Sequence, residues 1–282
     1  MHEWSLVFFT TISQIAVGIM IAVLPFAFSK NSKVNTKLKQ TALYSAAGLM
    51  FIALVLSFLH LNNPLHSVYA LSNLGTSWLS REILFVSLFL FCLVLVSLIP
   101  FVKKPKPLYY RTFILITTIV GLILIYSMAM LYIIPTVPAW NSLSTMIAFY
   151  ATALLLGSAF VLGLAFQFGT NGGKHSRPFQ KNRILVFLIQ LAVAIILINT
   201  FFFGPALPEG NVGFEPEPLG ATVGIARWTS MLIGAGILVY LNYKKDSLKH
   251  GGMLYYLPFV FFLISELIAR SAFYASFYNI GL

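Results

Sequence analysis

Eight long apolar runs follow one another along the chain, with short polar stretches between them. They cover residues 5–28, 41–61, 82–101, 112–134, 143–168, 184–203, 221–243 and 253–277. Each is about 20 residues long or longer, which is the length that a helix needs to cross the hydrocarbon core of a membrane. A helix also satisfies its own backbone hydrogen bonds in lipid. The pattern therefore predicts an all-α membrane protein, a polytopic bundle of eight transmembrane helices.

Composition supports the same class. Of the 282 residues, 59% are hydrophobic and only 9% are charged, and the mean hydropathy is +0.89, whereas soluble domains carry roughly 25% charged residues. Eight crossings use about 160 to 200 residues, so residues 1–282 are predicted to form a single integral membrane domain. The one cysteine, Cys92, lies in an apolar run, which argues against a disulfide or a thiolate-bound metal.

The charges are distributed unequally between alternate connections. One set of connections holds 15 of the 18 basic residues, and the other side of the predicted bundle holds six of the seven acidic residues. Because short loops rich in lysine and arginine stay in the cytoplasm, both termini are expected outside a cytoplasmic membrane. The net charge of +11 is then a topology signal that faces anionic lipid, and no nucleic-acid partner is expected.

Polar and ionisable side chains at membrane depth are costly and therefore mark candidate sites. In this sequence they gather in the outer halves of the predicted helices and at their outer ends. The members of this group are Gln14, His60, Arg81, Glu82, Arg227, Glu266 and Arg270.

Several of these residues also have a structural interpretation, which the sequence leaves open. Arg81 can be an interfacial residue that extends to water, and Arg227 an interface anchor with the tryptophan that follows it. Glu266 and Arg270 lie four residues apart on one helical face and can neutralise each other. Gln14 can form an interhelical hydrogen bond.

His60 and Glu82 form the pattern that most favours chemistry, because they lie at the outer ends of two neighbouring antiparallel helices. A histidine titrates near neutrality and can accept a proton from a hydroxyl group. A carboxylate near the water boundary can pass that proton outward. Oxidation of a hydroquinone needs such groups, since it releases two protons with two electrons. The sequence thus predicts a quinol-oxidising site near the outer face.

A haem in this protein is not expected. A haem held by two histidines needs pairs of histidines inside the bundle, and of the five histidines only His60 is expected at membrane depth. No motif predicts a bound metal either, so the electrons would have to leave to a cofactor on another protein. Two further hypotheses remain: a secondary transporter, and a passive anchor without a quinone site.

Several short motifs resemble those of the membrane anchor subunit of anaerobic dimethyl sulfoxide reductases, and they occur from one end of the sequence to the other. They are HEWSL at residues 2–6, LHL at 59–61 with Pro64, LSN at 71–73, LSREI at 79–83, TVPAW at 136–140 and ELIAR at 266–270. The sequence departs from the family at Asn62, where glycine is common, and at Arg81, where a small or amide residue is common.

The resemblance implies a haem-free subunit that oxidises menaquinol near the outer face and belongs to a molybdoenzyme complex for anaerobic respiration. Its implied partners are an iron–sulfur subunit with four [4Fe–4S] clusters and a catalytic subunit with molybdenum-bis(guanine dinucleotide). The histidine and glutamate of the family's quinol site fall on His60 and Glu82. The pocket is expected to be shaped by Gln14, Arg81, Arg227, Glu266 and Arg270.

Overall fold

The computed structural model of the protein describes residues 3–28, 33–59, 69, 71–101, 107–170, 182–203, 218–243 and 252–276. These residues contain eight helices long and apolar enough to cross a membrane, which confirms the predicted fold class. The eight helices are α1 (Glu3–Phe28), α2 (Lys33–Leu59), α4 (Trp78–Leu98), α5 (Pro107–Tyr132), α6 (Leu143–Thr170), α8 (Arg183–Phe202), α9 (Pro218–Tyr243) and α10 (Leu257–Ala275). Three short 3-10 helices accompany them: η2 (Leu71–Asn73), η3 (Ile99–Phe101) and η4 (Gly252–Tyr256).

Three helices begin four or more residues earlier than the apolar pattern predicts. Helix α2 begins at residue 33 instead of 41, α5 at 107 instead of 112, and α4 at 78 instead of 82. The added turns of α2 and α5 carry lysine and arginine, which are good helix formers. The start of α4 is fixed by Ser77, whose side chain accepts a hydrogen bond from the backbone N–H of Ser80 at 3.3 Å.

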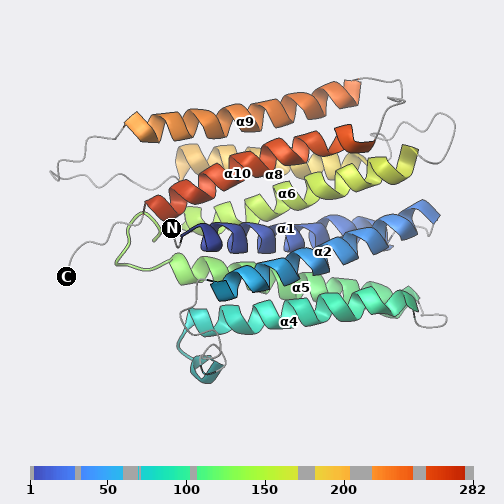
Figure 1. The fold of residues 1–282 in the computed structure, drawn as a ribbon, viewed down its shortest axis with the longest axis horizontal. Helices are drawn as coiled ribbons and strands as arrows, with labels where there is room; N and C mark the ends of the chain where they lie inside the picture. Colours follow the sequence, from blue (N-terminus) through green and yellow to red (C-terminus); the bar gives the residue numbers. More distant parts are fainter. Residues whose placement is uncertain are drawn as a thin grey trace.

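Successive helices alternate in direction, so the bundle has two distinct ends (Figure 1). At one end α1 and α4 begin and α10 finishes; we name it the glutamate end, because Glu82 lies in the first turns of α4. At the other end, α2 begins, and its first turns carry Lys37 and Lys39. We name this the lysine end. This alternation agrees with an even number of crossings.

Helix α1 lies at the centre of the bundle and packs against α2, α5, α6 and α10, whereas α4 and α9 lie along opposite edges (Figure 1). The crossing of α1 with α6 is made by two glycines. A Cβ atom at Gly18 would overlap the carbonyl of Ala153, and one at Gly157 would overlap the backbone of Gly18. Because small residues let helix backbones approach closely in lipid, this glycine pair sets the spacing of the central helices.

Candidate functional site

A layer of buried and half-buried polar side chains crosses the bundle in the half nearer the glutamate end. Six helices contribute to it: α1, α4, α5, α6, α9 and α10. We name it the polar layer, and its residues are Thr10, Gln14, Glu82, Tyr132, Thr152, Arg227, Glu266, Arg270 and Tyr274. It contains five of the seven candidates predicted from the sequence.

Arg270 of α10 lies at the centre of this layer and is only 5% exposed. Its Nη2 donates a hydrogen bond of 2.9 Å to Oε1 of Gln14 on α1. Its guanidinium carbon lies 3.8 Å from the centre of the Phe149 ring on α6, within the range of a cation–π contact. The interhelical hydrogen bond predicted for Gln14 is therefore present, and its partner is the arginine of the last helix.

Glu266 is held by two other helices. Oγ1 of Thr152 on α6 donates a hydrogen bond of 2.5 Å to its Oε2, and Nη2 of Arg227 on α9 lies 3.8 Å from its Oε1. Among the residues that the structure describes, Glu266 and Arg270 do not form the direct ion pair that their spacing favours. Each side chain turns instead to a neighbouring helix, so the two residues cross-link the bundle.

Three hydroxyl groups lie in a row beside Arg270. The hydroxyl of Tyr274 is 2.9 Å from that of Tyr132 and 3.3 Å from Oγ1 of Thr10. Thr10 in turn donates to the backbone carbonyl of Leu6 at 2.8 Å. Hydroxyl groups both donate and accept hydrogen bonds, so this row links α10 with α5 and α1 and ends at the Leu6 carbonyl.

Aromatic rings close the polar layer toward the glutamate end. Trp140, in the connection between α5 and α6, donates a hydrogen bond of 2.7 Å from Nε1 to the backbone carbonyl of Phe273. Its ring stacks on Phe273 with centroids 5.2 Å apart and meets Tyr132 edge-on at 5.4 Å. This packing fixes the connection, which contains the TVPAW motif, against the end of α10.

Glu82 and Glu266 each have one carboxylate oxygen without a hydrogen-bond partner among the described residues, but Glu266 has Arg227 beside that oxygen and Glu82 has no such ion pair there. Its side chain is 4% exposed and points into the bundle from α4, and its Oε1 has no hydrogen-bond partner among the residues that the structure describes. It interacts electrostatically with Tyr132 and Tyr274. A buried, unsatisfied carboxylate oxygen is costly, and this oxygen is therefore a candidate acceptor for a hydrogen bond from a ligand.

The other two sequence candidates, Arg81 and His60, are not among the residues of the polar layer that the structure describes. Arg81 donates from Nε to the carbonyl of Leu74 at 2.9 Å and from Nη2 to that of Gly75 at 2.7 Å, with its guanidinium 4.2 Å from the centre of the Trp78 ring. It braces the turn before α4 and does not bind the Glu82 carboxylate. His60, which follows the last residue of α2, lies outside the described residues.

Sequence reasoning missed the hydroxyl groups of Thr10, Tyr132, Thr152 and Tyr274. Two of them had a detectable signal, because Tyr274 lies four residues after Arg270 and Thr10 four residues before Gln14, on the same helical faces. The other two had none, since threonine and tyrosine occur equally well in lipid-facing and interfacial positions.

This arrangement, a buried polar layer in an eight-helix bundle, agrees with the outcome of sequence comparison. The family model for the DMSO reductase anchor subunit (DmsC) matches residues 1–276. The chain belongs to the DMSO reductase anchor subunit family. As a member of this family with eight apolar helices, it is a multi-pass membrane protein of the anchor-subunit class.

Curated relatives of this anchor subunit have consistent names. It is similar to the C subunit of anaerobic dimethyl sulfoxide reductase from Escherichia coli, with 26% identity over 289 residues that span 100% of this protein and 97% of the relative. The YnfH subunit of an anaerobic dimethyl sulfoxide reductase from the same organism is 26% identical over 287 residues, with the same shares covered. The corresponding C subunit from Haemophilus influenzae is 30% identical over 160 residues, 56% of each protein. No solved structure matches this anchor subunit.

Replacement of Arg270 tests the structural contribution of the layer. We expect Arg270→Gln to lower the thermal midpoint of the purified protein, because hydrogen bonds to charged groups contribute about 1.5 to 3 kcal/mol and the contact with Phe149 is also lost. Ser271→Ala is the matched control, since its hydroxyl bonds only to its own helix, at Leu267. Equal midpoints for the two variants would show that Arg270 does not tie α10 to α1.

Proposed function

We propose that this anchor subunit oxidises menaquinol at the glutamate end of the bundle and passes the electrons to an iron–sulfur subunit docked there. The observation that carries the proposal is the buried Glu82 carboxylate, with an oxygen free to accept a hydrogen bond, beside the hydroxyl row of Tyr132, Tyr274 and Thr10. A quinol hydroxyl is a donor of the kind that this oxygen lacks.

The proposed chemistry uses Glu82 and His60 as the groups that receive protons. Oxidation of one menaquinol releases two protons and two electrons and leaves menaquinone. His60 would hydrogen-bond one hydroxyl and take its proton, and Glu82 would accept a proton and relay it to the outer surface. General acid–base groups of this kind contribute about 10² to 10⁴ in rate.

The neighbouring charges would set the electrostatics of the site. Arg227, Glu266 and Arg270 are linked to the bundle through Gln14 and Thr152, and together they bear a net positive charge in their ionised forms. A positive field in a medium of low dielectric constant stabilises a carboxylate and an anionic semiquinone. Gln14 positions Arg270, while Arg81 contributes by holding the start of α4 that carries Glu82.

The two electrons need an acceptor outside this subunit. We propose that they pass one at a time to the nearest [4Fe–4S] cluster of a four-cluster iron–sulfur subunit, and from there to a catalytic subunit with molybdenum-bis(guanine dinucleotide). Dimethyl sulfoxide or a similar oxide would be the terminal acceptor, and the complex would lie in the cytoplasmic membrane with its quinol site near the outer face. Family membership favours this function over the alternative of a secondary transporter.

The experiment that tests the proposal separates quinol oxidation from anchoring. The anchor subunit is co-purified with its partner subunits, analysed for molybdenum and iron, and assayed with a menaquinol analogue and with an artificial dye as electron donors. We expect both donors to support reduction of the terminal acceptor. Dye-driven reduction without any quinol-driven reduction would show a passive anchor without a quinone site.

A further inference from the structure

A second polar site lies at the lysine end, toward the opposite end of the helices from the polar layer. It is a cavity of about 230 Å³ between α1, α2, η3 and α5. Since a water molecule occupies about 30 Å³ of liquid, the cavity has room for a polar group several times larger. Nine residues line it, and its polar members include Lys39, Gln40, Tyr110 and Arg111.

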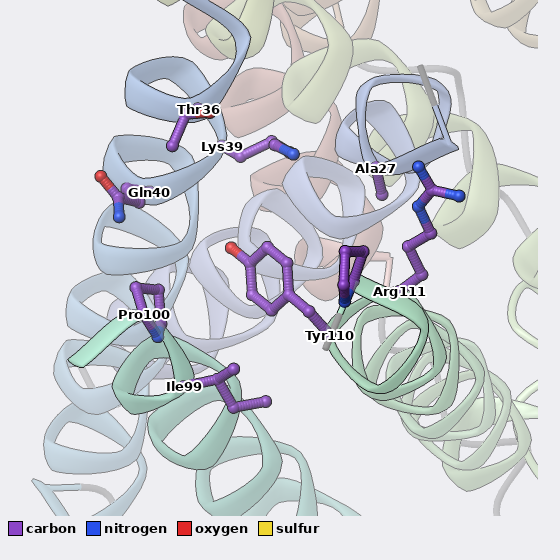
Figure 2. Close-up of a pocket in the computed structure, with 9 residues that line it drawn as sticks. Ala27, Thr36, Lys39, Gln40, Ile99, Pro100, Tyr110 and Arg111 are labelled. Atoms are coloured by element: carbon purple, nitrogen blue, oxygen red, sulfur yellow. The ribbon is translucent and has the colours of Figure 1, made fainter. Parts of the chain in front are cut away.

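The two charged residues that line this cavity, Lys39 and Arg111, are both basic. Lys39 is 4% exposed, and its ammonium group lies 5.7 Å from the centre of the Tyr110 ring. Figure 2 shows Lys39 extending from α2 and Arg111 from α5, with the Tyr110 ring below Lys39. The two cations repel each other electrostatically, and none of the nine lining residues is acidic. An anion between them would relieve this repulsion.

Neutral donors complete the cavity. The hydroxyl of Tyr110 is buried and has no hydrogen-bond partner among the described residues, and Gln40, the residue after Lys39 on α2, also lines the cavity. The apolar wall includes Ile99 and Pro100. Two cations, a hydroxyl donor and an apolar wall fit a ligand that joins a phosphate group to hydrocarbon.

We propose that this cavity binds the phosphate group of an anionic phospholipid headgroup. The cavity lies where α2 begins and α5 begins, at the boundary of their apolar spans, which is the depth of lipid headgroups. The excess of basic residues in the connections at this end predicts that it faces the cytoplasmic leaflet. Anionic lipids there attract basic side chains. A zwitterionic headgroup fits less well, because its own ammonium group would meet Lys39 and Arg111.

The test measures lipid binding by the purified full-length protein in a neutral detergent. Phosphatidylglycerol, phosphatidylcholine and inorganic phosphate are added separately, and the thermal midpoint is followed as a function of concentration. We expect phosphatidylglycerol to raise the midpoint at concentrations at least tenfold lower than phosphatidylcholine, and phosphate to have no comparable effect. An equal response to the two lipids would overturn the proposal, and a response to phosphate alone would show a free-phosphate site instead.

Variants of the residues that line the cavity test whether phosphatidylglycerol acts there. Arg111→Gln and Tyr110→Phe should each weaken the response to phosphatidylglycerol, by about tenfold for the loss of the charge. Arg183→Gln is the matched control, since Arg183 lies at the beginning of α8 and does not line the cavity. Lys39→Gln is the stronger variant, but burial of Lys39 can make it fold poorly, so the decision rests on Arg111 and Tyr110. An unchanged response in both of these variants would contradict the assignment.

Discussion

Replacement of Glu82 by glutamine is expected to reduce menaquinol-driven reduction of the terminal acceptor by about 10² to 10⁴, the range in which general acid–base groups contribute. Glutamine has the same shape and can still accept a hydrogen bond, but it cannot take up a proton. The side chain is buried and its Oε1 has no hydrogen-bond partner among the described residues. His60→Ala is expected to act in the same direction.

Dye-driven reduction separates this effect from a loss of structure. It should remain unchanged in Glu82→Gln, because the dye reduces the partner subunits without using the quinol site. Ser87→Ala on the same helix is the matched control, since Ser87 is exposed and bonds only to the carbonyl of Ile83. A Glu82→Gln complex that oxidises menaquinol within about twofold of the Ser87→Ala rate would remove Glu82 from the mechanism.

A single methyl group at Gly157 should have the largest effect on stability. The added Cβ would overlap the backbone of Gly18, and a backbone cannot move aside as a flexible side chain can. Overpacking of a well-packed core costs about 1 to 3 kcal/mol or more, and here α1, the central helix, would have to separate from α6. We expect Gly157→Ala to lower the thermal midpoint and the yield of monodisperse protein.

Gly48→Ala is the control for that variant, because a Cβ at Gly48 meets nothing within 4 Å. Alanine is also the better helix former by about 1 kcal/mol, so this change should be neutral or slightly stabilising. Gly18→Ala should resemble Gly157→Ala, since the two glycines face each other. Equal yields and midpoints for Gly157→Ala and Gly48→Ala would mean that the α1–α6 crossing is not limited by the glycine pair.

The sequence predicted the eight helices well because crossing a membrane demands a long apolar segment, and hydropathy detects such segments directly. It located helix starts less well. The first turns of α2 and α5 carry Lys37, Lys39 and Arg111, which are polar and therefore fall outside an apolar run although they are helical. The start of α4 depends on a serine cap, Ser77, whose signal is weak because serine is equally common in turns.

The charged members of the polar layer could be predicted from the sequence, whereas the contacts between them could not. Buried charges such as Glu266 and Arg270 stand out in an apolar sequence because each is costly. Their partners come from other helices, Thr152 on α6 and Gln14 on α1, and the spacing along one helix contains no information on these contacts. The i, i+4 spacing therefore favoured a direct pair that the fold replaces with two interhelical contacts.

The central claim is that a quinol binds at the glutamate end and not at the lysine end. The most direct test is a titration of a fluorescent hydroxyquinoline N-oxide, a quinol analogue, into membranes that contain the complex with the wild-type anchor subunit, Glu82→Gln or Arg111→Gln. We predict saturable binding at one site per complex for the wild type and Arg111→Gln, and at least tenfold weaker binding for Glu82→Gln. Unchanged binding in Glu82→Gln, or a loss that follows Arg111→Gln, would contradict the claim.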